Sequence, residues 1–208
     1  GKGHRVIACI LVVALLGGII VTDRTDFGRK NAHLSGNAAY AYLAESMECL
    51  SFGWMRWLVY WLGTQLSNEM DASGQYRRAC VAIANEDFTE AATWMELSAG
   101  NAQQQTDEEK ETLSIQLACV RSLAGDADGA LKAAKEGVQH RSEDDQLLKL
   151  LYQFSLDAGD AQSAAEALMQ YAELTDDTGY YEEIADLYFE AGMYEDSGRF
   201  YELAMEEN

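Results

Sequence analysis

The residues that could bind a metal or carry redox chemistry are few and widely separated in this chain. Its cysteines stand singly, as do its three histidines, His4, His33 and His140. The four cysteines are Cys9, Cys49, Cys80 and Cys119. Structural zinc sites and disulfide frameworks need ligands or partners at short, regular spacings such as CxxC. We therefore predict no metal site and no cofactor, and we interpret the cysteines as small buried thiols.

Carboxylates are the other groups that could do chemistry. The fragment GDADG at 125–129 is similar to the start of a calcium loop, but the acid that such a loop needs at its twelfth position is missing. The acidic runs DEEKE, SEDDQ and TDDTGYYEE are typical of solvated helix ends. The chain also lacks a GxSxG elbow, a phosphate-binding loop and an HExxH pair. We predict that the protein is not an enzyme.

Charge is distributed very unevenly along the sequence. Residues 1–67 hold six Lys and Arg against four Asp and Glu, whereas residues 68–208 hold nine against thirty-one. So acidic a region repels the phosphates of nucleic acids, which disfavours nucleic-acid binding. Two interpretations stay open: the acid serves solubility alone, or it selects a basic partner segment.

An apolar segment near the start predicts a membrane anchor. Residues 6–21 are sixteen consecutive apolar residues, which as a helix would span about 24 Å against a hydrocarbon core of ~30 Å. A signal peptide is the alternative, but no small-residue cleavage site follows. We predict an uncleaved anchor over residues 1–24 and a single-pass membrane protein whose remaining chain lies outside the cytoplasm.

A second apolar segment, residues 52–66, is rich in tryptophan. It belongs to a predicted helical connector over residues 25–72. Helical spacing places its tryptophans on one stripe, and Arg56 could extend toward lipid head groups. The membrane-interface residues predicted here are Trp54, Arg56, Trp57 and Trp61. The alternative is an ordinary buried helix at the end of the following domain.

From residue 73 onward the chain repeats itself. Similar sequence segments occur at 85–98, 124–138, 158–172 and 191–204. The predicted turn residues are Glu86, Gly125, Gly159 and Gly192, which stand 39, 34 and 33 residues apart. An aspartate follows each of the first three turns, where it can accept hydrogen bonds from the amides that open a helix. The chain contains no proline, which favours helices joined by tight turns.

This pattern resembles the tetratricopeptide repeat family, whose unit is a helix-turn-helix of 34 residues. The last unit carries the resemblance most clearly, with Ala185, Tyr188, Gly192 and Ser197 at family positions. The resemblance covers about residues 73–208, although the proline that usually ends each unit is absent. It implies an all-α fold in which a right-handed α-solenoid of about four repeats follows the transmembrane helix. The architecture is similar to that of membrane-anchored bacterial proteins of this family.

The resemblance also implies a groove lined by the first helix of each repeat. The family's groove positions fall on Tyr76, Cys80, Ile83, Ile115, Cys119, Ser122, Lys149, Gln153, Leu156, Glu182, Asp186 and Phe189. In that order the groove passes from apolar to acidic, which predicts a protein partner with an apolar part followed by basic residues. The C-terminal helix offers a further surface for a partner or for self-association.

The function that follows is a membrane-tethered scaffold or adaptor for protein–protein interaction, in secretion or envelope assembly. The alternative is a fixed structural subunit of an integral membrane complex.

Overall fold

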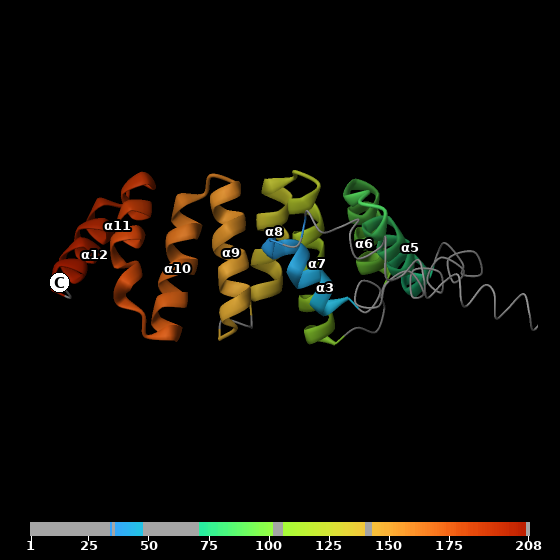
Figure 1. Ribbon diagram of the computed structural model, residues 1–208, viewed down its shortest axis with the longest axis horizontal. Coiled ribbons are helices and arrows are strands. Elements are labelled where there is room, and N and C mark those ends of the chain that lie inside the picture. Colours follow the sequence, from blue (N-terminus) through green and yellow to red (C-terminus); the bar gives the residue numbers. More distant parts are fainter. Residues whose placement is uncertain (1–33, 35, 48–70, 102–105, 140–142, 207–208) are drawn as a thin grey trace, which may run out of the picture. The chain divides into compact units, whose positions relative to one another are not determined.

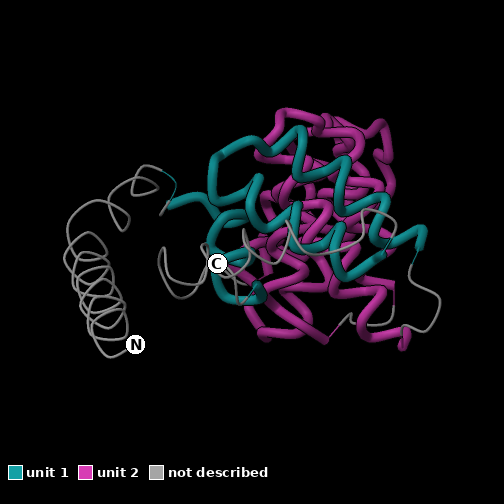
Figure 2. Tube along the Cα trace, turned by 90° about the vertical axis from the view of Figure 1, so that its right-hand side faces the viewer, with its two compact units in different colours: residues 1–101 teal, residues 102–208 magenta. Residues whose placement is uncertain are grey.

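The computed structural model is helical in every regular element that it describes (Figure 1). It describes residues 34, 36–47, 71–101, 106–139 and 143–206. The prediction of an all-α fold is thereby confirmed for these residues. The chain divides into two compact units, Gly1–Asn101 and Ala102–Asn208, shown in two colours in Figure 2. The predicted domain boundaries at residues 24 and 72 stay predictions.

Unit 1 contains a short helix, α3 (Ala38–Ser46), and a helical hairpin formed by α5 (Ala72–Ala84) and α6 (Phe88–Asn101). Two side-chain hydrogen bonds connect the helices of the hairpin. The Ser98 hydroxyl donates to the Ala72 carbonyl at 2.8 Å, and the Asn101 amide donates to the Gln75 side chain at 3.1 Å. The first predicted repeat is therefore an antiparallel helix pair.

Unit 2 contains three further hairpins. They are α7 (Asp107–Leu123) with α8 (Ala127–Val138), α9 (Asp145–Asp157) with α10 (Ala161–Thr175), and α11 (Tyr181–Glu190) with α12 (Tyr194–Glu206). A 3-10 turn, Thr178–Tyr180, precedes α11. Besides these pairings, α8 packs on α9 and α10 packs on α11. The first two hairpins of unit 2 thus each pack on the first helix of the hairpin that follows.

The four predicted turn residues all adopt the left-handed backbone conformation. The φ angles are 62° at Glu86, 83° at Gly125, 70° at Gly159 and 75° at Gly192. Each turn is closed by the amide of the following residue, which bonds to the carbonyl five residues earlier at 2.8–2.9 Å. Glycine adopts this conformation without steric cost, and Glu86 adopts it at a cost. The repeated turn is why the hairpins share one register.

Aspartates begin the second helices of the first three hairpins, as the sequence predicts. Asp87, Asp126 and Asp160 each accept a hydrogen bond at 3.0 Å from the amide three residues later. The first helix of unit 2 begins with a capping box, in which the Thr106 hydroxyl accepts from the Glu109 amide and the Glu109 carboxylate accepts from the Thr106 amide. The GDADG fragment supplies Asp126 as a helix cap.

The cap at Asp160 predicts a pH-dependent stability. Hydrogen bonds from the Ser163 amide and hydroxyl, and the ion pair with Lys135 at 3.0 Å, hold the pKa of Asp160 below its ordinary value. A carboxyl group whose pKa is lowered on folding stabilises the native state above its unfolded pKa of about 3.9. That contribution is lost as the pH falls through the lower, folded-state pKa.

We expect Asp160→Ala to lower the free energy of unfolding by about 1 kcal/mol at pH 7. The difference from wild type should shrink as the pH falls below about 4, because the wild-type carboxyl group is then protonated too. Thermal unfolding followed by circular dichroism, at pH 7 and at a pH below about 4, measures the difference in stability between the variant and the wild type. Thr106→Ala is the control, since it removes a hydroxyl cap that does not titrate. A difference at Asp160 that stays constant with pH would contradict the assignment.

One sequence prediction is corrected here. We predicted a single-pass membrane protein, yet within the residues that the structure describes no helix is long and apolar enough to cross a membrane. The described helices have seventeen residues or fewer and each contains at least one charged residue, and about twenty apolar residues are needed to span a bilayer. The segments that motivated the prediction, residues 6–21 and 52–66, lie outside the described residues.

Candidate partner-binding surface

The first helix of the second hairpin in unit 2, α9, presents a polar and apolar stripe. Lys149, Gln153 and Leu156 are all exposed on it. Lys149 lies over the Tyr171 ring, 4.6 Å from its centroid, and its contact with Tyr171 raises the pKa of the ammonium group. The Gln153 amide donates to Asp157 at 3.0 Å. These three predicted groove residues thus share one accessible face of α9.

The equivalent stripe on α11 is acidic and ends on an aromatic ring. Glu182, Asp186 and Phe189 are exposed, and Phe189 is 58% accessible. Asp186 accepts a hydrogen bond from the Tyr201 hydroxyl, which raises the pKa of Tyr201. The Phe189 ring meets the Tyr194 ring edge to face at 5.4 Å between centroids. The carboxylate and the ring are therefore held by α12 in defined positions.

A hydrogen bond places the two stripes beside each other. The Tyr152 hydroxyl on α9 donates to the Glu183 carboxylate on α11. Partial burial and this hydrogen bond both raise the pKa of Tyr152, so it stays a neutral donor at physiological pH. Each of these residues neighbours the stripe of its own helix in sequence. Sequence reasoning missed both, although their helical phase beside the groove positions was the available signal.

The remaining predicted groove residues are mostly buried. The buried residues are Cys80 and Ile83 on α5, and Ile115 and Cys119 on α7. Burial raises the pKa of the Cys119 thiol, so it stays protonated. Tyr76 is half-buried and Ser122 is half-buried. The accessible part of the predicted groove in unit 2 is therefore Ser122 with the stripes of α9 and α11.

Ile115 shows why its position on α7 is not available to a partner. A Cβ atom added at Gly137 of α8 would lie 2.5 Å from the Ile115 Cδ1 atom and 2.9 Å from the Glu111 carbonyl oxygen. The isoleucine therefore fills the space that the glycine leaves open between α7 and α8. The resemblance predicted a groove residue here, and the structure places a core residue.

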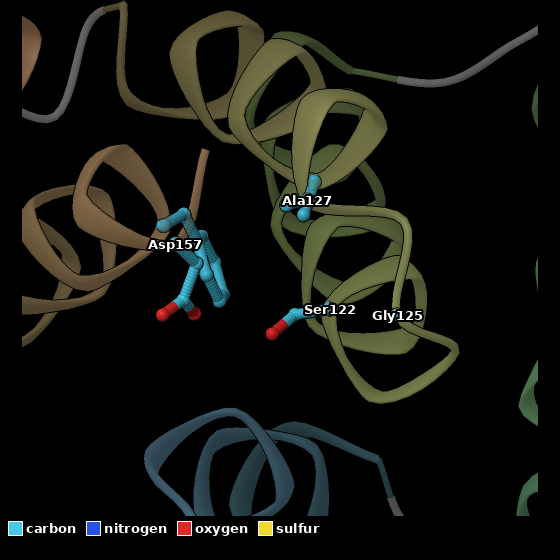
Figure 3. Close-up of a pocket in the computed structure, with 6 residues that line it drawn as sticks. Ser122, Gly125, Ala127 and Asp157 are labelled. Atoms are coloured by element: carbon cyan, nitrogen blue, oxygen red, sulfur yellow. The ribbon is translucent and has the colours of Figure 1, made fainter. Parts of the chain in front are cut away.

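Ser122 lines a small pocket between the first two hairpins of unit 2 (Figure 3). Its lining residues are Ser122, Gly125, Ala127, Ala130, Phe154 and Asp157. The Ser122 hydroxyl and the Asp157 carboxylate point into the opening (Figure 3). Phe154 and Ala130 are buried and supply an apolar floor. An apolar side chain with a basic end would match this lining. Sequence reasoning found Ser122 and missed Asp157, which directly follows the predicted Leu156.

The last hairpin carries a strong negative charge. From Asp176 to Glu206 there are ten Asp and Glu residues, and the one basic residue is Arg199. Carboxylates so concentrated attract cationic groups at long range and repel anionic ones. The predicted membrane-interface residues Trp54, Arg56, Trp57 and Trp61 lie outside the described residues.

No protein-family model matches the chain, and no curated protein matches its sequence. Solved structures do resemble it. The chain is 15% identical to a structure titled MamA 41-end from Desulfovibrio magneticus RS-1, with a TM-score of 0.52, covering 82% of this chain and 95% of that one. A MamA RS-1 double mutant gives 14% identity, a TM-score of 0.52 and coverages of 82% and 94%. A further MamA crystal structure gives 11%, 0.51, 82% and 92%.

These likenesses concern the fold, because the identities are low. MamA is an all-helical protein of tetratricopeptide type, and the described part of this chain resembles it in fold. The repeat pattern in the sequence, the left-handed turn common to the four hairpins of this chain and the structural neighbours all indicate this fold.

Proposed function

We propose that this chain, with its tetratricopeptide-type fold, is a scaffold that binds a segment of another protein on the exposed stripes of α9 and α11. The observation that carries the proposal is that Leu156 and Phe189 occupy the same register position, three residues before the turn glycines Gly159 and Gly192. Both large apolar side chains are exposed. Repeated apolar side chains on the first helices form a row that a peptide can cover.

The polar residues around this row define the chemistry of the partner. Glu182 and Asp186 lie on the Phe189 stripe, and Asp157 lies at the rim of the pocket beside Leu156. A partner segment with apolar residues followed by lysine or arginine matches this order. Its apolar side chains would cover Leu156 and Phe189, and its cations would face the carboxylates. Ionic steering would make association faster at low salt than at high salt.

A selection from a random peptide library on the purified chain tests the proposal. We expect enriched peptides to combine apolar residues with lysine or arginine. The double variant Leu156→Ser, Phe189→Ser should bind these peptides at least about tenfold more weakly, which corresponds to ~1.4 kcal/mol of lost binding free energy. Raising the salt concentration to about 1 M, where the screening length is ~3 Å, should also weaken the binding of these peptides to the wild-type chain.

Leu174→Ser is the matched control, because Leu174 is an exposed leucine on α10 outside both stripes. The control should bind the selected peptides as the wild type does. Enrichment of acidic peptides, or equal binding by the double variant and the control, would refute the proposed surface.

A further inference from the structure

An exposed apolar stripe runs along the outer face of α12. Tyr194, Gly198, Tyr201 and Met205 follow one another at helical spacings of four, three and four residues, so they share one face of the helix. Tyr194 is 66% accessible and Met205 is 70% accessible. A Cβ atom at Gly198 would meet no atom within 4 Å. We call these four residues the C-terminal stripe.

Three of the four stripe positions are buried in the two preceding hairpins of unit 2, and the position of Tyr194 is half-buried there, at Ala127 and Ala161. Counting from the turn glycines, the positions equivalent to Gly198, Tyr201 and Met205 are Leu131, Ala134 and Val138 in α8, and Ala165, Leu168 and Ala172 in α10. All six are buried, with Leu168 only 4% accessible. They lie on the helices that receive the next hairpin, α8 against α9 and α10 against α11. In these two hairpins the stripe therefore belongs to the face of the second helix that packs against the following hairpin.

The packing of α11 on α10 shows which side chains a helix bound to this face contributes. Ile184 and Tyr188 of α11 belong to one buried cluster with Leu168 and Ala172 of α10. These two side chains are four residues apart, so they project from one face of α11. An occupant of the C-terminal stripe is accordingly expected to be a helix with apolar residues at intervals of three and four.

The charges beside the stripe decide the rest of the occupant's chemistry. Glu195, Glu202 and Glu206 each follow a stripe residue by one position, so they form a parallel acidic row along one flank. A second copy packed through its own C-terminal stripe would bring a like-charged row to this face, which is unfavourable. Lysine or arginine along one edge of the occupant would complement it.

We propose that the C-terminal stripe binds an amphipathic helix of a partner protein, with apolar residues on one face and basic residues along one edge. This site goes beyond the α9 and α11 stripes, because its anchoring side chains come from α12. Two contacts hold those anchors in place before binding: the Tyr194 ring rests on Phe189, and the Tyr201 hydroxyl is bonded to Asp186. Anchors held in their bound positions lose little conformational entropy on association.

Two synthetic helical peptides of about 20 residues, a length that supports a helix in water, test the proposal. Both carry the same leucine stripe; one carries lysine along its edge and the other glutamate. Fluorescence anisotropy with the full 208-residue chain measures binding. We expect the lysine peptide to bind at least about tenfold more tightly than the glutamate peptide. The double variant Tyr194→Ser, Met205→Ser should lose at least about tenfold of that affinity.

Control variants separate this site from the first proposal. Leu174→Ser should bind the lysine peptide as the wild type does, because Leu174 lies on α10, outside the C-terminal stripe and outside the α9 and α11 stripes. Circular dichroism confirms that each variant is folded. Equal binding of both peptides would overturn the charge argument. Loss on Leu156→Ser without loss on the double variant would move the peptide to α9. A wild-type dimer that Tyr194→Ser, Met205→Ser abolishes would make a second copy the occupant and overturn the proposal.

Discussion

Phe154→Ala should lower the free energy of unfolding by about 4 kcal/mol, which is the cost typical of emptying a buried phenylalanine site. Phe154 is 1% accessible and lies in α9, at the floor of the pocket bounded by α7, α8 and α9. Its removal would leave a cavity beside the pocket that neighbouring alanines are too small to fill. For a chain of this size the melting temperature should fall by roughly 8–16 °C. Thermal unfolding monitored by circular dichroism measures the change.

The chain offers a matched control in the next repeat. Phe189 is 58% accessible, so Phe189→Ala removes little buried surface and should cost at most about 1 kcal/mol. The proposed partner site predicts the opposite order for binding, since Phe189 is an exposed anchor of that surface whereas Phe154 is only 1% accessible. Two phenylalanine variants that were equally destabilised would contradict the placement of one in the core and one on the surface.

Gly137→Val should destabilise unit 2 by about 3 kcal/mol, at the upper end of the usual cost of overpacking. The new Cβ atom would lie 2.5 Å from Cδ1 and 2.7 Å from Cγ1 of Ile115, and 2.9 Å from the Glu111 carbonyl oxygen. The backbone oxygen cannot move without displacing α7. Chemical denaturation of the variant, compared with wild type, measures the loss.

Two further variants test the cause of that loss. Ile115→Val removes the Cδ1 atom and should recover part of the stability in the Gly137→Val background, with a coupling of about 0.5–3 kcal/mol. Gly198→Ala is the positional control, because Gly198 also lies in a second helix but faces open space. Alanine there should stabilise the protein by about 0.5–1 kcal/mol. Unchanged stability in Gly137→Val would contradict the close approach of α7 and α8.

The turns and helix starts were predictable from the sequence because their causes are local. Gly125, Gly159 and Gly192 adopt left-handed φ angles that other residues avoid. Asp126 caps the next helix through the amide three residues later, which needs nothing beyond its own turn. The register that these signals set along the chain was therefore recoverable without a structure.

The exposure of individual groove positions was less predictable, because it depends on contacts between helices. Ile115 and Lys149 hold the same register position, 34 residues apart. Ile115 is buried opposite Gly137, whereas Lys149 stands exposed beside the much larger Tyr171. The two cases differ in the side chain itself, isoleucine or lysine, and in the size of the residue beside it on the second helix. The apolar segment at 6–21 was likewise interpreted from hydropathy alone, and the single-pass prediction made from it is not supported by the described helices.

The most direct measurement of the central proposal is site-specific photo-cross-linking in the cells that make the protein. A photoreactive amino acid replaces Gln153, at the centre of the α9 stripe, or Gln170, an exposed glutamine on α10. We expect a discrete protein adduct from position 153, none from position 170, and a cross-linked segment that combines apolar and basic residues. Equal adducts from both positions, or an adduct from position 170 alone, would contradict it.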